Sequence, residues 1–291
     1  MQVHEKFNAL HADVTIRSSD GVLFKLHRAN LSATTGAFPG TDISTEGVDV
    51  QLTEPSVVLE IIFQFIYPQK HPPLKGLTFD VLLQVAEAVE KYEVFPAMWI
   101  CETRLRERIK EHALKILLHG IKHDYPDLIN ESSLQLALRP IVLVARELSP
   151  NQILPWIQYR EAWRGILADV KKVLDGPKSG YSKCSTTYYY NFPEPIEAPE
   201  TLFCLQCVVN LKAWVHDLEP IESVEELRRT ISSSTAGDIG RGCEGCGKSV
   251  KDSSTKQRCM HFAYVQKRLL QSLDAVPPFT DFLNKALEPE V

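Results

Sequence analysis

The chain has 291 residues, of which 44% are hydrophobic and 24% are charged, and its formal net charge at pH 7 is −5. This composition is ordinary for a folded protein with one or two cores, and the mild acidity argues against a dedicated nucleic-acid-binding or membrane-surface protein. The apolar stretches are too short for a membrane-spanning helix, and the first residues lack the apolar centre of a secretory signal. We therefore expect a cytoplasmic or nuclear protein with no nucleic-acid and no membrane partner.

Residues 13–27 are predicted to form a β-hairpin. Apolar and polar side chains alternate on both sides of Asp20-Gly21, a dipeptide typical of the tight turn between antiparallel strands. A third alternating run at residues 48–52 predicts a short further strand. Together with the helices that follow, these strands predict an α+β domain over residues 12–110.

Three amphipathic helices are predicted after the third strand. The first begins at Thr53-Glu54-Pro55, where a capping residue is followed by a proline suited to the first turn, and it ends at Pro68. Thr78 is expected to cap the second helix, and Pro96 is expected to open the third. The inward face of the third helix is predicted to hold Met98, Cys101, Leu105 and Ile109.

The remaining two thirds of the chain are predicted to be mainly α-helical. Helical spacing continues over residues 111–176, which we expect to form a helical extension whose most regular helix follows Pro155. Residues 177–200 are rich in Ser, Tyr and Pro and are predicted to be a linker, with a lone edge strand as the alternative. Residues 201–291 are predicted to form a helical, cysteine-containing module, in which Ser223 and Glu226 have the spacing of a capping box.

Several short phrases in residues 12–92 occur together in a specific order. They are Ala12-Asp13-Val14, Asp20-Gly21, Phe24-Lys25-Leu26-His27-Arg28, Leu31-Ser32, Phe38, Phe65-Ile66-Tyr67, Ala86 and Tyr92. With the order hairpin, helix, strand and three helices, they resemble the BTB (POZ) domain, most closely that of fungal BTB-only proteins. The resemblance implies a small mixed sheet capped by helices, followed here by a BACK-like helical extension.

The resemblance also implies a protein that works through its surface. BTB domains self-associate or bind partners, including the cullin-3 scaffold of ubiquitin ligases, and the positions that correspond here to partner-binding residues are Asp13, Arg28, Ile43 and Glu46. The spacing between Ile43 and Glu46 is one residue longer than that of the hydrophobic-x-Glu triplet in cullin-binding members. Asp13 has a second interpretation, in which it accepts hydrogen bonds from backbone donors at the strand edge. His27 is expected to be a buried, hydrogen-bonded residue and not a catalytic base.

Four of the seven cysteines form two Cys-x-x-Cys pairs, Cys204 with Cys207 and Cys243 with Cys246. Two such pairs are typical of a structural zinc site, because four thiolates complete a tetrahedral shell and leave no position for a catalytic water. The glycines around the second pair resemble those of a zinc knuckle. We therefore expect one structural zinc ion in a small C-terminal module. Reduced cysteines without metal and a redox Cys-x-x-Cys pair are the alternatives.

Three further residues are candidates for the same metal cluster: Cys184, Cys259 and His261. The alternative for Cys259 is packing in a helix core. The alternative for His261, and the one we favour, is exposure to solvent.

The sequence thus predicts an interaction protein and not an enzyme. Its function is expected to be self-association or recruitment of a protein partner, with an adaptor of a cullin-3 ubiquitin ligase as the most concrete form. The second hypothesis is a nuclear transcription regulator that self-associates through its BTB domain. A thiol-redox enzyme is the third.

Overall fold

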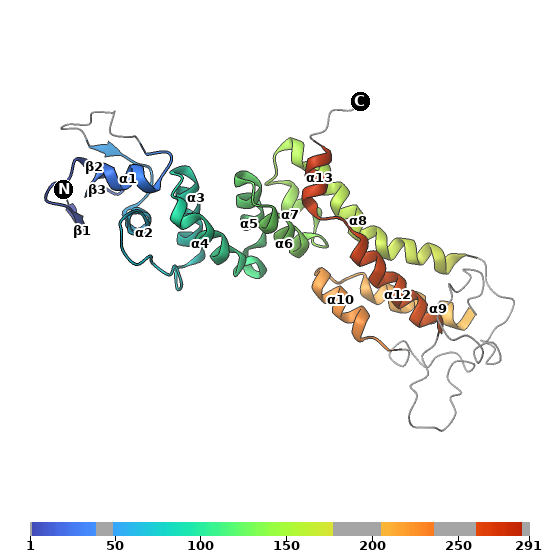
Figure 1. Cartoon of the computed structure of the whole chain (residues 1–291). Helices are drawn as coiled ribbons and strands as arrows, with labels where there is room; N and C mark the ends of the chain where they lie inside the picture. Colours follow the sequence, from blue (N-terminus) through green and yellow to red (C-terminus); the bar gives the residue numbers. More distant parts are fainter. Residues whose placement is uncertain (1, 39–48, 177–204, 236–259, 287–291) are drawn as a thin grey trace, which may run out of the picture. The chain divides into compact units, whose positions relative to one another are not determined.

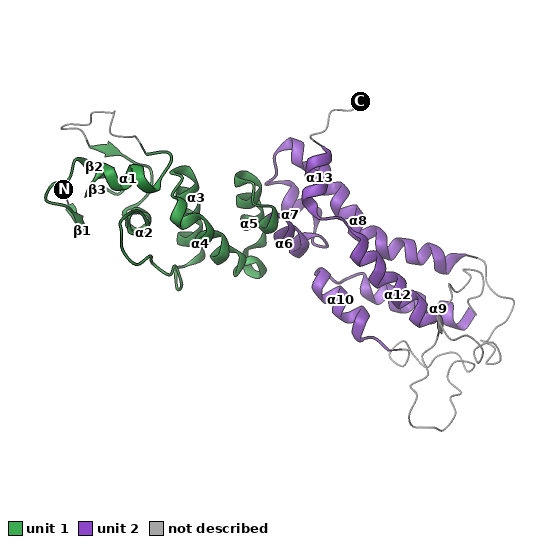
Figure 2. Cartoon of the chain, viewed as in Figure 1, with its two compact units in different colours: residues 1–128 green, residues 129–291 purple. Residues whose placement is uncertain are grey.

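Figure 1 presents the computed structural model of the chain, which describes residues 2–38, 49–176, 205–235 and 260–286. Within these residues the fold is α+β and mostly helical, with a four-stranded mixed sheet and 12 helices. The predicted fold class is confirmed at this level. The chain divides into two compact units, Met1–Leu128 and Ile129–Val291, and the division lies inside the predicted helical extension (Figure 2). None of the described helices is long and apolar enough to cross a membrane.

The predicted hairpin is present at the centre of the sheet of unit 1. Strands β2 (Val14–Arg17) and β3 (Val22–Leu26) pair in antiparallel register, with Ile16 opposite Phe24. Gly21 closes the turn with φ +85°, a backbone conformation that residues with a Cβ atom rarely adopt. Both Ile16 and Phe24 are buried, so the alternation in the sequence corresponds to one core-facing side of the hairpin.

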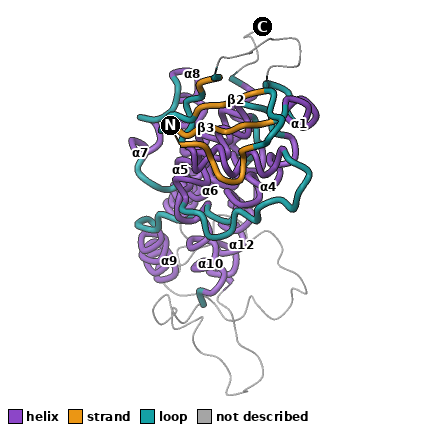
Figure 3. Tube along the Cα trace, turned by 90° about the vertical axis from the view of Figure 1, so that its left-hand side faces the viewer, coloured by secondary structure: helices purple, strands orange, loops and turns teal. Residues whose placement is uncertain are grey.

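Two outer strands complete the sheet in the order β1-β3-β2-β4 (strands orange in Figure 3). The predicted third strand is present as β4 (Val50–Gln51), which runs parallel to β2. Strand β1 (Gln2–Asn8) runs parallel to β3 and was not predicted, since the first strand was expected at residue 13. Only Val3 and Phe7 are apolar in β1, so its pattern is weak. Burial of Phe7 beside Phe24 and Phe63 supplies the missing stabilisation.

Five helices follow the hairpin in unit 1 and agree with the predicted order. They are α1 (Arg28–Thr34), α2 (Ser56–Ile66), α3 (Phe79–Lys91), α4 (Phe95–Arg106) and α5 (Ile109–His123). Helix α2 contributes most of its apolar side chains to the core, and α3 contacts both α2 and α4. As predicted, Cys101 and Leu105 of α4 are buried, as is Ile109 at the start of α5, whereas Met98 is only half-buried.

Unit 2 is helical throughout its described residues. Its helices are α6 (Pro126–Leu136), which begins before the division, α7 (Ile141–Ala145), α8 (Pro150–Asp175), α9 (Leu205–Leu218), α10 (Val224–Ser233), α12 (Met260–Ala275) and α13 (Phe279–Lys285). Helix α8 contacts α7, α9, α12 and α13 and is therefore the centre of the unit. The Ser223 half of the predicted capping box of α10 is confirmed, because the Ser223 hydroxyl accepts the Glu226 N–H at 3.3 Å.

The long helix α8 starts at Pro150, whereas the prediction placed its beginning after Pro155. A capping box between Ser149 and Gln152 and a proline at the first helical position start the helix at Pro150. Trp156 and Tyr159 of α8 are buried against Phe279 of α13, with ring centroids 5.3 and 5.2 Å from the Phe279 ring. This aromatic cluster joins two helices that are far apart in the sequence.

Candidate functional site

The structure brings two of the predicted partner-binding residues, Asp13 and Arg28, into direct contact. The Asp13 carboxylate accepts the backbone N–H of Arg28, the first residue of α1, at 2.7 Å. The Arg28 Nε donates to the Asp13 carbonyl oxygen at 3.4 Å, and the Arg28 side chain is buried. Asp13 therefore satisfies a backbone donor, as its second interpretation expected, but this donor lies at the start of a helix and not at the strand edge. A role of either residue in binding a partner stays a prediction.

A second junction joins the end of β3 to the end of α2. The backbone N–H of His27 donates to the Tyr67 hydroxyl at 2.9 Å, and the imidazole Nδ1 lies 3.2 Å from the same oxygen. His27 is hydrogen-bonded, as expected, but it is half-buried and not fully enclosed. Tyr67 directly follows the last residue of α2, so the Phe65-Ile66-Tyr67 phrase places this hydroxyl where the hairpin ends.

The other predicted partner-binding residues, Ile43 and Glu46, lie outside the described residues, as do most of the predicted zinc ligands: Cys204, Cys243 and Cys246. Cys184 and Cys259 are also outside them. Cys207 is described and lies buried on α9, with Leu211 on the same side of the helix. The zinc hypothesis therefore stays a prediction.

The preferred expectation for His261 is wrong, because this residue is buried and not exposed. Its helix α12 contacts α8, α9 and α10. A helix with neighbours on several sides buries more than the single apolar stripe from which the exposure was predicted. The next residue, Phe262, packs edge-on against Trp214 of α9, with ring centroids 5.0 Å apart.

The surface of unit 1 carries an aromatic pair on α4 that the sequence analysis did not single out. Phe95 and Trp99 are 57% and 73% exposed, and their spacing of four places them on one face of the helix. The buried residues Ala97, Cys101 and Leu105 hold the opposite face against the core. The signal was available in the sequence, since both aromatic residues are out of phase with this buried stripe. We refer to Phe95 and Trp99 as the α4 aromatic pair.

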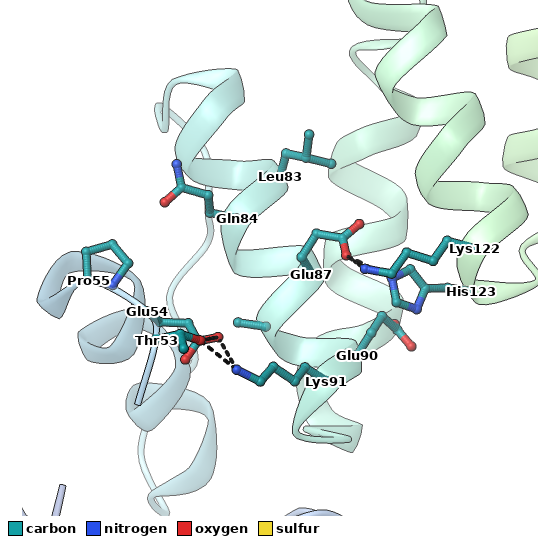
Figure 4. A pocket seen from close by; sticks show the side chains of 11 residues that line it. Thr53, Glu54, Pro55, Leu83, Gln84, Glu87, Glu90, Lys91, Lys122 and His123 are labelled. Atoms are coloured by element: carbon teal, nitrogen blue, oxygen red, sulfur yellow. Dashed lines mark hydrogen bonds and ion pairs between the residues drawn. The ribbon is translucent and has the colours of Figure 1, made fainter. Parts of the chain in front are cut away.

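The segment before α2 and the last turns of α3 border a surface cavity of about 700 Å³ (Figure 4). Lys91 bridges Thr53 and Glu54 across this cavity with distances of 2.8 and 2.7 Å, and the Tyr92 hydroxyl donates a short hydrogen bond to Glu54. Burial alone raises the pKa of the Glu54 carboxyl, but hydrogen bonds from Lys91 and Tyr92 outweigh it and leave this pKa below its usual value. Burial and then the Glu54 carboxylate raise the pKa of Tyr92.

The cavity lining combines charged side chains with apolar ones, among them Pro55, Leu83 and Ala88. The α4 aromatic pair is apolar and exposed, which suits the surface of another protein. Comparison with known proteins does not assign the chain to a family. No family model matches the chain, and no curated protein matches it.

Proposed function

We propose that this chain is a protein–protein interaction module of the BTB (POZ) type, which acts by binding and not by catalysis. Residues 12–110 are its binding domain, and residues 111–176 are a helical extension. The residue phrases of the hairpin, of α1 and of the end of α2 support the family assignment. The α+β arrangement of unit 1 is compatible with it, since a hairpin is followed by a helix, a parallel strand and further helices.

The observation that carries the proposal is the exposure of the α4 aromatic pair. Large aromatic side chains are enriched at the centres of protein interfaces, where their removal from water supplies much of the binding free energy. A single exposed Phe or Trp is common on protein surfaces, but two of them one turn apart on the same helix face concentrate exposed apolar surface in one place. We propose that a second copy of this chain covers the pair, because a two-fold dimer places the same patch of each subunit against the other.

The experiment is a concentration series in light scattering coupled to size-exclusion chromatography. We expect the mass to rise toward that of a dimer with concentration, and we expect the double substitution Phe95→Ser, Trp99→Ser to keep the protein monomeric. The matched control is Leu10→Ser, which removes another exposed apolar side chain, 91% exposed, outside α4. A monomer at all concentrations, or a dimer that the double substitution leaves intact, would refute self-association through this face.

Recruitment of a partner for ubiquitin transfer is the second form of the proposal. It is tested by capture of purified cullin-3 scaffold on the immobilised full chain, with the α4 double substitution in parallel. Retention by the natural chain and loss in the double substitution would support an adaptor whose docking face is α4. An empty capture at micromolar concentrations would exclude cullin-3 as a partner. A role in transcription would use the same self-association. For the two roles together, adaptor and transcription regulator, we propose a location in the cytoplasm or the nucleus.

We further propose that Cys204, Cys207, Cys243 and Cys246 bind one structural zinc ion. Four thiolates leave no open position on the ion, so the site would stabilise the C-terminal module and perform no chemistry. The burial of Cys207 on α9 is compatible with this, since an enclosed thiolate needs a compensating cation. Metal analysis of protein purified in metal-free buffer tests it. The expected zinc disappears when the four cysteines are replaced by serine.

A further inference from the structure

One carboxylate of unit 1 is surrounded by nitrogen atoms of a single helix. Glu87 of α3 meets three side chains of α5: Nδ1 of His119 lies 2.7 Å from Oε1, Nε2 of His123 lies 3.1 Å from Oε2, and Lys122 forms a short ion pair with Oε2. Figure 4 shows Glu87 pointing toward Lys122 and His123 at the border of the cavity. One ligand atom each from Glu87, His119 and His123 can be chosen so that all three lie within 4.8 Å of one another.

The local sequence explains why the two imidazoles converge. His119 and His123 are four residues apart in α5, so their side chains project from the same face of the helix on successive turns. This His-x-x-x-His spacing is the one by which a helix presents two imidazoles to a zinc ion. Glu87 supplies a third donor from another helix, which no local spacing pattern contains.

The surroundings hold the His119 imidazole in place. His119 is only 3% exposed, and its ring stacks on Tyr125 with an interplanar angle of 11° and a centroid distance of 6.0 Å. The Tyr125 hydroxyl in turn donates to Glu90 of α3. Ligands that are fixed in this way lose little entropy when they bind an ion.

Glu87 is held as a carboxylate. Its burial would raise its pKa, but the hydrogen bonds from His119, Lys122 and His123 outweigh burial and hold this pKa well below its ordinary value. A metal ligand must be deprotonated, so the protons by which the two imidazole nitrogens bond to Glu87 move to the other ring nitrogens or to solvent when an ion takes their place.

From this geometry we propose that Glu87, His119 and His123 bind a divalent transition-metal ion of the zinc class. Two imidazoles and a carboxylate are a donor set that zinc ions use in proteins. Ligands about 2.1 Å from a tetrahedral ion lie roughly 3.4 Å apart. The 2.7 and 3.1 Å contacts, which the two imidazoles make with different oxygens of Glu87, therefore open slightly, and the three donor atoms, which lie within 4.8 Å of one another, gather around the ion. A solvent molecule from the adjoining cavity supplies the fourth ligand. The bound ion clamps α3 to α5.

Lys122 is the group that competes with the ion for Glu87. Its side chain is 64% exposed, so its ammonium group can move into water when a metal replaces it. Removal of this ammonium group is therefore expected to strengthen metal binding. A cluster that is only an ion-pair network predicts no metal binding in either form.

The test is titration of Co²⁺ into the full chain after removal of metals with a chelator, followed by visible absorption. We expect ligand-field bands of a site with nitrogen and oxygen donors. A cysteine site gives an additional thiolate-to-cobalt charge-transfer band, so the two sites are read separately. Glu87→Gln and His123→Ala are expected to weaken Co²⁺ binding at the nitrogen–oxygen site more than about tenfold, because loss of a direct ligand costs at least as much as loss of an outer-sphere partner.

Two variants complete the design, and circular dichroism verifies the fold of each. Lys122→Met is expected to bind Co²⁺ more tightly than the natural chain. His112→Gln is the matched control, because His112 lies on the same helix but stacks on Phe79 away from the cluster, and it should leave binding unchanged. The proposal is overturned if the natural chain shows no nitrogen–oxygen bands, if Glu87→Gln and His123→Ala bind as the natural chain does, or if His112→Gln weakens binding equally. None of these results depends on the α4 aromatic pair, so this inference and the proposed function fail separately.

Discussion

Asp20, in the turn of the hairpin, accepts two hydrogen bonds from Ser56, the first residue of α2. The backbone N–H of Ser56 lies 2.9 Å from one carboxylate oxygen of Asp20, and the Ser56 hydroxyl lies 2.6 Å from the other. The same Asp20-Gly21 dipeptide that turns the hairpin therefore also satisfies a free N–H at the start of a helix 36 residues later. This contact links the sheet of unit 1 to its central helix.

Replacement of Asp20 by alanine is expected to destabilise unit 1 by about 1 kcal/mol, the usual cost of losing a side-chain acceptor at a helix start. Hydrogen bonds from Ser18 and Ser56 lower the pKa of Asp20 to about 2. The stabilisation is therefore complete above about pH 4 and is lost as the pH falls toward 2, because only the folded state holds this carboxylate ionised there. Urea unfolding at several pH values measures it. Asp20→Asn, which keeps an acceptor but no charge, should lack this part of the pH dependence; an unchanged dependence would contradict the assignment.

Two substitutions on α4 are expected to differ sharply in their effect on stability. Trp99→Ser removes a 73% exposed side chain and should change the free energy of unfolding by less than about 0.5 kcal/mol. Leu105→Ala removes a fully buried side chain and should cost about 2–5 kcal/mol. Urea denaturation followed by circular dichroism measures both. Equal losses would mean that Trp99 stabilises the fold and is not free for an interface.

The aromatic cluster of unit 2 is expected to depend on α13. Phe279→Ala leaves a cavity beside Trp156 and Tyr159 and should destabilise unit 2 by about 3–5 kcal/mol. The change is followed by tryptophan fluorescence, because Trp156 is fully buried in the native fold. Lys285→Ala, an exposed position on the same helix, is the control and should leave the transition in place. A small effect of Phe279→Ala would show that α13 does not contribute to this core.

Thiol titration distinguishes Cys101 from the cysteines of the proposed zinc site. Burial and then the negative charge of Glu90 raise the pKa of the Cys101 thiol to about 12, so it should not react in the native protein at pH 8. Cysteines that bind zinc should become reactive when a chelator is added, whereas Cys101 should react only after denaturation. Labelling followed by peptide mass spectrometry assigns each thiol. Labelling of Cys101 in the folded chain would contradict its buried environment.

Local patterns in the sequence were sufficient for the hairpin, for the order of the helices and for the Ser223 cap of α10. They were not sufficient for the caps expected at Thr53 and Thr78, because α2 begins only at Ser56 and the Thr78 side chain makes no capping hydrogen bond. Asp20-Gly21 needs a positive φ at its glycine, and the Ser223 hydroxyl satisfies one free N–H at a helix start, that of Glu226. Both features depend only on residues that are neighbours in the sequence, so a short stretch of sequence is sufficient to predict them. The buried stripe of α4 follows for the same reason, because helical periodicity places Cys101 and Leu105 on one side.

Contacts between distant residues could not be obtained in this way. Strand β1 is stabilised by burial of Phe7 against rings of β3 and α2, His261 is buried because α12 has several neighbouring helices, and Glu87 meets His119 and His123 only when α3 and α5 are both in place. In each case the free energy comes from groups that are separated in the sequence and become neighbours through folding. The amino-acid sequence by itself determines which segments form turns, strands or helices, because these local structures depend mainly on adjacent residues. Which side chains meet, and therefore where an ion or a partner can bind, depends on how the hydrophobic faces pack together.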